Sequence, residues 1–215
     1  DSGETVKVTA ADGRFLGYGA YSPKSTLRVR MWSFDEAENT EVPEFLHARL
    51  EKAVKAREGL LARTTARRIV FGEADGIPGL IVDQYGDWLV TQFQSAGTER
   101  RRDEIVADLM AMTGAKGLFD RSDAATRQRE GLAVHTGVLA GEEPPELIEV
   151  VEDGVKYGVN VRLGHKTGFY VDQRESRLAA QQLARDFEKT HGRKMRALNC
   201  FCYTGGFSLA LALGG

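Results

Sequence analysis

Residues 197–208 read Ala-Leu-Asn-Cys-Phe-Cys-Tyr-Thr-Gly-Gly-Phe-Ser, and residues 209–213 continue as Leu-Ala-Leu-Ala-Leu. An apolar run, a polar break with two glycines and an Ala/Leu-rich run are typical of a buried strand that turns sharply into a helix. Such a unit opens an α/β nucleotide-binding fold. We therefore expect a strand that ends near Cys202, a turn over residues 203–206 and a helix after it.

The composition is that of an ordinary globular protein. The 215-residue chain is 42% hydrophobic and 28% charged, and its formal net charge is -2. This charge neither indicates nor excludes a nucleic-acid partner, because local basic clusters also bind phosphate. No apolar stretch approaches the ~20 residues that cross a bilayer, so we expect no membrane partner. With two cysteines and no signal peptide, a reducing cytoplasm is the expected location.

The first 34 residues predict a small β unit. Residues 4–10 alternate like a strand, Asp12-Gly13 is typical of a hairpin turn, and residues 15–21 and 27–32 predict two more strands. Three strands with one apolar face are few for a closed core, so we interpret them as the remainder of a barrel-like domain. Arg28 and Arg30 share one face of the third strand. That face suits RNA phosphates or, as the spacing alone favours, plain solvation.

The next segment predicts a helix and then a compact α+β domain. Apolar residues recur at helical spacing from Pro43 to about Leu61, with Thr40 as the expected cap. Strand patterns at 67–73, 80–85 and 88–94 precede an amphipathic helix at 99–112 and a strand at 116–123. This order of elements indicates a compact α+β domain over roughly residues 65–143, for which we expect an EEHEE-type arrangement. It shows no catalytic constellation, and we interpret the lone His135 as structural.

A second chemically dense stretch follows the linker Glu-Glu-Pro-Pro at residues 142–145. A hairpin pattern at 147–152 and 155–161 leads into residues 164–174, Gly-His-Lys-Thr-Gly-Phe-Tyr-Val-Asp-Gln-Arg, which open a helix. Two glycines around a lysine and a threonine bring backbone N–H groups and a cation near an anionic group. The spacing of a phosphate-binding P-loop is absent. A structural turn and a ligand loop fit this pattern equally well.

The two cysteines do not form a recognisable metal or redox motif. Cys200 and Cys202 share a face of the expected strand. Two thiols are too few for a structural zinc site, and a redox pair more naturally has Cys-x-x-Cys spacing. We therefore interpret Cys200 as a small buried filler and Cys202 as a turn residue near a ligand. Because the three-glycine dinucleotide fingerprint is absent, Gly205-Gly206 suits a nucleoside or amino-acid group better than a pyrophosphate.

Six segments together resemble one family, the S-adenosylmethionine (SAM)-dependent methyltransferases that make 5-methylcytosine in large-subunit (23S) ribosomal RNA. The resemblance covers nearly the whole chain, and the last two segments are the specific ones. The six are Gly-Ala-Tyr-Ser-Pro (19–23), Arg-Val-Arg-Met-Trp (28–32), Gly-Glu-Ala-Asp-Gly-Ile-Pro-Gly-Leu (72–80), Phe-Asp-Arg-Ser-Asp (119–123), residues 164–174 and Asn-Cys-Phe-Cys-Tyr-Thr-Gly-Gly-Phe (199–207).

The resemblance implies a multidomain protein that combines α+β and α/β folds. Residues 1–34 would be the C-terminal part of a PUA-like RNA-binding domain, residues 35–143 a helix and the central α+β domain, and residues 144–215 a hairpin and the beginning of a Rossmann-like methyltransferase domain. The implied cofactor is SAM, and no metal is implied. The cofactor-binding residues that it implies are Lys166, Thr167, Gly168, Tyr170, Asp172, Gln173, Arg174, Asn199, Phe201, Tyr203, Thr204, Gly205 and Gly206.

The resemblance also implies nucleophilic catalysis. A thiolate adds to carbon 6 of cytosine, the opposite carbon takes the methyl group, and a base removes its proton. The acidic residue for the ribose, the Asp-Pro-Pro motif and the nucleophilic cysteine are expected beyond Gly215. We therefore assign no catalytic residue, neither Cys200 nor Cys202, and expect this fragment by itself to be inactive.

The expected partner is ribosomal RNA. The sequence does not determine the target nucleotide, the RNA-contacting face or the oligomeric state, and a homodimer is kept open. Two alternatives stay open as well. One is a non-catalytic RNA-binding module, and the other is a methyltransferase of the same build that acts on another RNA or on a small molecule.

Overall fold

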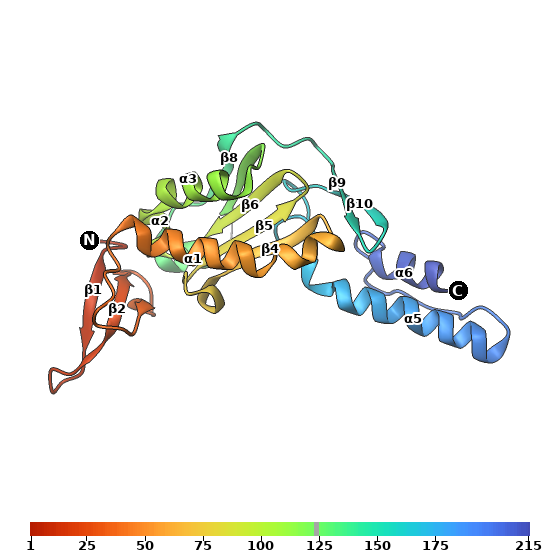
Figure 1. Ribbon diagram of the computed structural model, residues 1–215, viewed down its shortest axis with the longest axis horizontal. Coiled ribbons are helices and arrows are strands. Elements are labelled where there is room, and N and C mark those ends of the chain that lie inside the picture. The colour runs from red at the N-terminus through yellow and green to blue at the C-terminus, as the bar shows by residue number, and fades with distance from the viewer. Residues whose placement is uncertain (123–124) are drawn as a thin grey trace. The chain divides into compact units, whose positions relative to one another are not determined.

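The computed structural model describes residues 1–122 and 125–215 (Figure 1). The chain divides into two compact units, Asp1–Phe169 and Tyr170–Gly215. The first unit holds all the strands that the described residues form, and the second is built from helices and irregular segments.

The first unit begins with a three-stranded antiparallel sheet. Strands β1 (Thr5–Thr9), β2 (Phe15–Tyr21) and β3 (Val29–Ser33) lie in the order β1-β2-β3. Gly13 in the connection between β1 and β2 has a φ of 84°, a conformation that glycine adopts without steric cost. All three strands expected in the first 34 residues are thus confirmed.

Helix α1 (Pro43–Ala56) follows, and a 3-10 turn, η1 (Glu58–Ala62), extends it. Its cap residue is Val42 and not Thr40, because Pro43 occupies the first turn, where the missing N–H of proline is no loss. The apolar stripe of α1 is buried, and the Phe45 ring meets Trp32 of β3 edge to face at 6.2 Å. The helix therefore joins the N-terminal sheet to the central core.

The central domain is a five-stranded mixed sheet in the order β4-β5-β6-β7-β8, formed by β4 (Ala66–Phe71), β5 (Leu80–Tyr85), β6 (Trp88–Phe93), β7 (Gly117–Ser122) and β8 (His135–Gly141). Only β6 and β7 are parallel among these pairs, since α2 (Ala96–Arg100) and α3 (Arg102–Thr113) make the crossover between them. The sequence pattern did not predict β8. Its register with β7 places His135 opposite Ser122.

Helices α1 and α3 lie side by side over this sheet (Figure 1). The apolar core lies between these helices and strands β4 to β7, and it includes Leu46, Leu50, Ile69, Val82, Leu89 and Leu109, all fully buried. Short elements complete the unit: η2 (Gly72–Asp75) between β4 and β5, and α4 (Ala125–Glu130) before β8. Residue 123, the expected end of a strand, lies outside the described residues.

The predicted hairpin is formed by β9 (Ile148–Glu152) and β10 (Val155–Val159). Asp153 and Gly154 in its turn both have positive φ, 47° and 84°, as a two-residue hairpin requires. Arg63 binds the Asp153 carboxylate at 2.8 Å and so ties the turn to the central domain. The hairpin belongs to the first compact unit, and the domain boundary expected between residues 143 and 144 stays a prediction.

The second unit contains η3 (Val171–Gln173), α5 (Arg174–His191) and α6 (Gly206–Gly214). Helices α5 and α6 pack closely, because a Cβ at Gly214 would lie only 2.2 Å from the carbonyl oxygen of Gln181. The helix expected after the Gly-Gly turn is thus confirmed.

The strand expected before that turn is not formed. Residues 195–202 are irregular, and the side chains of Leu198 and Phe201 are 86% and 96% exposed. A strand is held by the hydrogen bonds of a neighbouring strand, and none of the strands in the described residues pairs with this segment. Both cysteines are exposed, so the interpretation of Cys200 as a buried filler is wrong in this structure.

Candidate cofactor site

The first group of predicted cofactor residues lies in the loop over residues 160–169 of the first unit. The side chain of Asn160 accepts hydrogen bonds from the N–H groups of Arg162 and Leu163, at 3.0 and 2.8 Å. The N–H of Gly164 donates to the Asn160 carbonyl at 2.9 Å, and that of Gly168 donates to the His165 carbonyl at the same distance. The loop is therefore a series of closed turns.

The two glycines of this loop are required by close approach. A Cβ at Gly164 would lie 2.6 Å from the carbonyl oxygen of Gly168, which itself has a φ of 138°. Lys166 between them is exposed and has a φ of 59°, which residues with a side chain seldom adopt. The loop thus presents the lysine to solvent from a constrained main chain.

Thr167 has the opposite orientation. Its side chain is buried, and its hydroxyl donates to the Asp83 carboxylate at 2.5 Å and lies 2.7 Å from the Tyr85 hydroxyl. The Tyr85 oxygen also accepts from the N–H of Phe169 at 3.2 Å. Arg68 completes the cluster with two hydrogen bonds to Asp83, at 2.8 and 2.9 Å.

The protonation of this cluster is set by its burial. Burial, aided by the nearby Asp83 carboxylate, raises the pKa of the Tyr85 hydroxyl far above its ordinary value of about 10. The hydroxyl therefore stays protonated, and it donates to Thr167 while it accepts from Phe169. Thr167 is 1% exposed and its hydroxyl is engaged inside the unit, so the exposed surface of the loop at this point is that of Lys166.

A second side chain holds the same loop from β7. Arg121 is buried, and its guanidinium donates to the carbonyl oxygens of Val161 and Gly164 at 2.6 and 3.3 Å. The sequence pattern singled out Arg121 only as part of a motif, and it did not single out Asp83, Tyr85 or Arg68. Asp83 and Tyr85 are two apart near the end of β5, so their side chains project from the same face of the strand. This two-residue spacing was the sequence signal that could have predicted a shared polar site for Asp83 and Tyr85.

The second group of predicted residues lies in the second unit. The rings of Tyr170 and Tyr203 meet edge to face with centroids 5.5 Å apart. The buried Arg177 donates to the carbonyl oxygen of Tyr170 at 3.1 Å. Asp172 and Gln173 lie in η3, and Arg174 is the first residue of α5. The structure therefore brings the two tyrosines together from segments 33 positions apart in the numbering.

The Gly-Gly turn is the most distinctive feature of the second unit. Tyr203 and Gly205 both have positive φ, 47° and 77°, and the N–H of Gly205 donates to the Cys202 carbonyl at 2.7 Å. Gly205 is the cap residue of α6, and no side chain caps this helix. The first N–H groups of an α-helix have no partner within the helix, so they favour an anionic or polar ligand. Thr204 is exposed beside them.

The other residues of this group are less closely gathered. Asn199 donates to the Ser208 hydroxyl at 3.0 Å, whereas Phe201 is almost fully exposed. A cavity of about 240 Å³ in the second unit includes Asn199 but none of the other predicted cofactor residues. It is smaller than the ~300–1,000 Å³ of typical ligand pockets, so it does not itself define a cofactor pocket.

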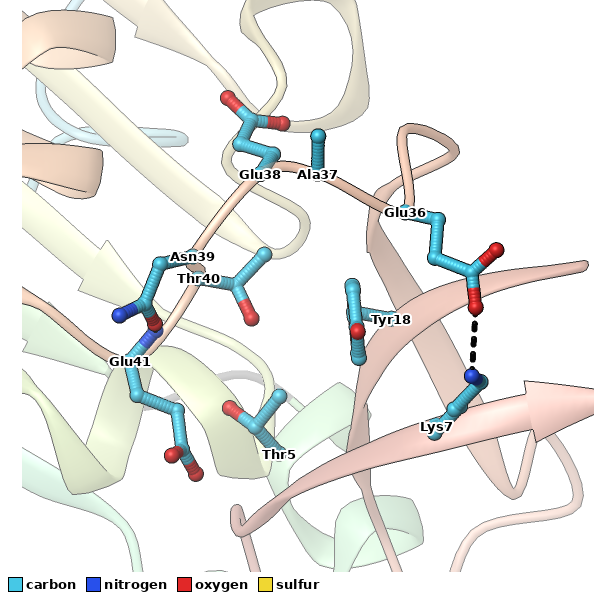
Figure 2. A pocket seen from close by; sticks show the side chains of 9 residues that line it. All are labelled: Thr5, Lys7, Tyr18, Glu36, Ala37, Glu38, Asn39, Thr40 and Glu41. Atoms are coloured by element: carbon cyan, nitrogen blue, oxygen red, sulfur yellow. Dashed lines mark hydrogen bonds and ion pairs between the residues drawn. The ribbon is translucent and has the colours of Figure 1, made fainter. Parts of the chain in front are cut away.

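The arginines of the N-terminal sheet are engaged within the protein. Arg30 forms ion pairs with Glu73 and Glu130, both at 3.2 Å, and Arg28 donates to the Pro23 carbonyl. A hollow of about 330 Å³ beside this sheet is lined mainly by polar and acidic residues, and its Lys7 is paired with Glu36 at 2.6 Å (Figure 2). The positive charges of Arg30 and Lys7 are thus compensated by carboxylates within the protein.

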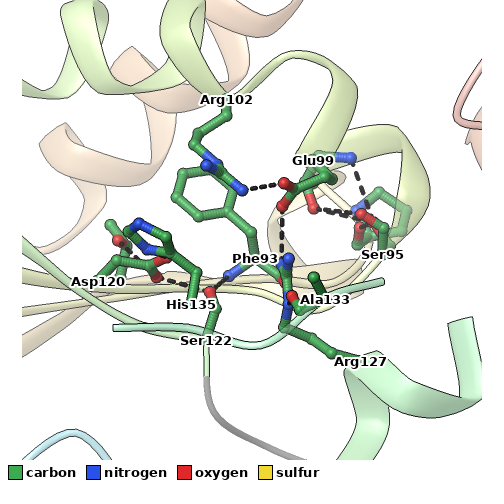
Figure 3. Close-up of polar contacts among 12 residues, drawn as sticks. Phe93, Ser95, Glu99, Arg102, Asp120, Ser122, Arg127, Ala133 and His135 are labelled. Atoms are coloured by element: carbon green, nitrogen blue, oxygen red, sulfur yellow. Dashed lines mark hydrogen bonds and ion pairs between the residues drawn. The ribbon is translucent and has the colours of Figure 1, made fainter. Parts of the chain in front are cut away.

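A cluster of polar side chains surrounds β7. Arg127 donates to the Phe93 carbonyl and to the Glu99 carboxylate, and the imidazole of His135 lies 2.8 Å from the buried Asp120 carboxylate (Figure 3). His135 thus has an internal partner, as its structural interpretation requires. Within residues 1–122 and 125–215, no group of three His, Cys, Asp or Glu residues is placed to hold a metal ion. None of the helices in these ranges has the length and apolar character that a membrane span needs.

Comparison with known proteins supports the resemblance along the whole chain. Residues 1–34 match a family model described as a PUA-like domain. The "Ribosomal RNA large subunit methyltransferase I" of Photobacterium profundum is 45% identical over 215 residues, and that of Aeromonas hydrophila is 44% identical over 216. Each match covers 99% of this chain and 52% of the relative, so the chain spans about half the length of these relatives.

Two solved structures have the same fold. One is a protein of Streptococcus mutans described as a candidate SAM-dependent methyltransferase, with a TM-score of 0.79. The other is described as a candidate methyltransferase in complex with SAH, with a TM-score of 0.81. Both are 24% identical to this chain, and both matches cover all of it and 53% of the solved chain. The expected fold class, a mixed α and β structure with PUA-like N-terminal strands, is thus confirmed.

Proposed function

We propose that the protein is a SAM-dependent methyltransferase of large-subunit ribosomal RNA and that its product is 5-methylcytosine. The observation that carries this proposal is the 40–45% identity, along 99% of the chain, to relatives named as ribosomal RNA large subunit methyltransferases. The specificity for carbon 5 of cytosine rests on the family resemblance of residues 164–174 and 199–207. The complex of a structural neighbour with SAH, the product of methyl transfer from SAM, supports the choice of cofactor.

The residues present fit this cofactor. SAM supplies the methyl group when bound, and it carries a carboxylate that suits the uncapped N-terminus of α6. The Gly205-Gly206 turn lets a ligand approach the backbone closely, and the Tyr170–Tyr203 pair offers aromatic surface. In the first unit, Lys166, Thr167 and Gly168 are the residues we assign to cofactor binding. Asp172, Gln173, Arg174, Asn199, Phe201 and Thr204 complete the proposed set.

The RNA-binding part is proposed to be the PUA-like segment of residues 1–34. A protein that modifies ribosomal RNA works where ribosomes are made, so we place it in the cytoplasm. A homodimer stays a prediction.

The test is methyl transfer by a full-length protein that contains this sequence. Large-subunit ribosomal RNA is incubated with isotope-labelled SAM, and the RNA is digested to nucleosides for mass spectrometry. We expect the label in 5-methylcytidine. A different methylated nucleoside would overturn the carbon-5 specificity. Transfer only to a small molecule would overturn the RNA substrate.

A protein that only binds RNA would transfer no label. Filter binding to structured RNA with and without SAM identifies that case, because a bare binding module has the same RNA affinity in both conditions.

A further inference from the structure

We propose that Tyr85 and Asp83 are positioning residues for cofactor binding, because they hold residues 164–169 in the main-chain conformation that presents Lys166. The inference rests on the proposed function, in which Lys166 contacts SAM. Neither side chain belongs to the predicted cofactor set. Both act through the loop that they anchor.

Tyr85 and Asp83, which we call the anchor, are buried, and each hydrogen-bond donor between them and the loop meets an acceptor. Tyr85 and Asp83 are fully buried, and Thr167 is 1% exposed. Tyr85 donates to Thr167, Thr167 donates to Asp83, and the backbone N–H of Phe169 donates back to Tyr85. A buried network in which each group has a partner specifies one arrangement, since any other leaves a polar group without one.

The anchor forms its hydrogen bonds with the loop immediately beside Lys166. Thr167 follows the lysine directly, and Arg121 holds the carbonyl of Gly164 two positions before it. Lys166 itself has a φ of 59°. A residue with a side chain persists in this region when the surrounding structure imposes it. The contacts on both sides of Lys166 are the structure that does so.

A purely structural network would have a different effect from a positioning one. Loss of a structural hydrogen bond lowers stability and leaves the affinity of the folded protein for its ligand unchanged. Loss of a positioning hydrogen bond lets the loop adopt other conformations. Only the fraction of molecules that still has the binding conformation binds the ligand, so the measured affinity falls in proportion to that fraction.

The experiment uses the full-length protein and the variant Tyr85→Phe, which keeps the ring and removes one hydroxyl. Hydrogen exchange of the 164–169 peptide reports the anchor, and calorimetric titration with SAM reports cofactor affinity. The matched control is Ser95→Ala. Its buried hydroxyl also makes several hydrogen bonds in the same unit, to Pro78 and Thr98.

We expect Tyr85→Phe to speed exchange in residues 164–169 and to weaken SAM binding about fivefold to tenfold, as loss of one buried hydrogen bond would. Ser95→Ala should lower the melting temperature without changing either quantity. Thr167→Val should behave like Tyr85→Phe, whereas Thr167→Ser, which keeps the hydroxyl, should restore wild-type affinity.

The outcomes separate this inference from the proposed function. Unchanged exchange in Tyr85→Phe overturns the anchor whatever the cofactor is. Faster exchange with unchanged SAM affinity overturns the positioning role. A wild-type protein that does not bind SAM at all overturns the proposed function, and with it the cofactor role of the loop, while the exchange data still decide whether the anchor exists.

Discussion

The hydroxyl of Tyr85 lies 2.7 Å from the side-chain oxygen of Thr167, although 82 positions separate the two residues. This contact links the end of β5 to the loop that carries a predicted cofactor lysine. The Asp83 carboxylate beside it accepts hydrogen bonds from both the Thr167 hydroxyl and the Arg68 guanidinium. The loop after the β9–β10 hairpin is therefore part of the central domain's polar core.

Replacement of Asp83 should cost substantial stability. Asp83→Ala removes the acceptor of two hydrogen bonds from Arg68 and of one from the buried Thr167 hydroxyl, and a buried polar group left without a partner costs about 1–3 kcal/mol. Urea unfolding of the full-length protein measures this loss. Glu51→Gln is the control, because it removes a carboxylate of similar charge from an exposed pair with Lys55. Equal unfolding midpoints for the two variants would contradict the buried network.

Substitutions at Gly205 should be tolerated in the order in which the new residues adopt a positive φ. Its φ is 77° and a Cβ would meet no atom within 4 Å, so only the backbone opposes substitution. Gly205→Val should weaken SAM binding about tenfold, whereas Gly205→Asn should retain most affinity, since asparagine adopts this conformation more readily. Calorimetric titration of both variants measures the difference. Identical affinities would remove the turn from the proposed site.

The exposed threonine of the same turn provides a milder test. Thr204→Ala should weaken SAM binding, because Thr204 is exposed and directly precedes Gly205, the cap residue of α6, whose first turn has no side-chain cap. The same titration measures the effect, and Thr190→Ala on α5 is the control, because its hydroxyl is bonded within its own helix at Asp186. An affinity equal to that of the control would exclude Thr204 from the site.

The cysteine of the turn should not be the nucleophile. Cys202→Ser in the full-length protein should retain most methyl transfer, because the cysteine belongs to the proposed cofactor segment rather than to the catalytic one. The rate of label transfer to RNA is the measurement. Complete loss of transfer with intact SAM binding would refute this assignment.

The stability contribution of His47 should depend on pH. Its imidazole lies 3.0 Å from the Asp108 carboxylate, and this hydrogen bond raises the pKa of His47 above its ordinary 6.5. Because the pKa of His47 is higher in the folded than in the unfolded protein, its ion pair contributes its full stabilisation at pH values below the pKa of the unfolded state. This contribution is lost as the pH rises through the pKa of the folded state. His47→Gln should therefore have a lower unfolding midpoint than wild type at acidic pH and an equal one at alkaline pH. A difference that does not change with pH would contradict the ion pair.

Local patterns determined most of the elements. The alternation of residues 4–10, the Asp153-Gly154 turn and the apolar spacing of α1 each depend on neighbours in the chain, and the strands and helix appear where expected. The resemblance of residues 164–174 and 199–207 likewise needed only the order of residues. The sequence by itself therefore determined the fold class and the proposed cofactor.

Tertiary structure decided which side chains anchor and which are exposed. Thr167 is directed into the first unit because Asp83 and Tyr85 lie beside it, a proximity that no local pattern encodes. The strand expected at residues 197–202 is absent because a strand depends on the hydrogen bonds of a neighbour rather than on its own apolar residues. The spacing of apolar residues along the chain determines whether a segment is a helix or a strand. Contacts between residues far apart in the sequence are determined only when these elements pack together.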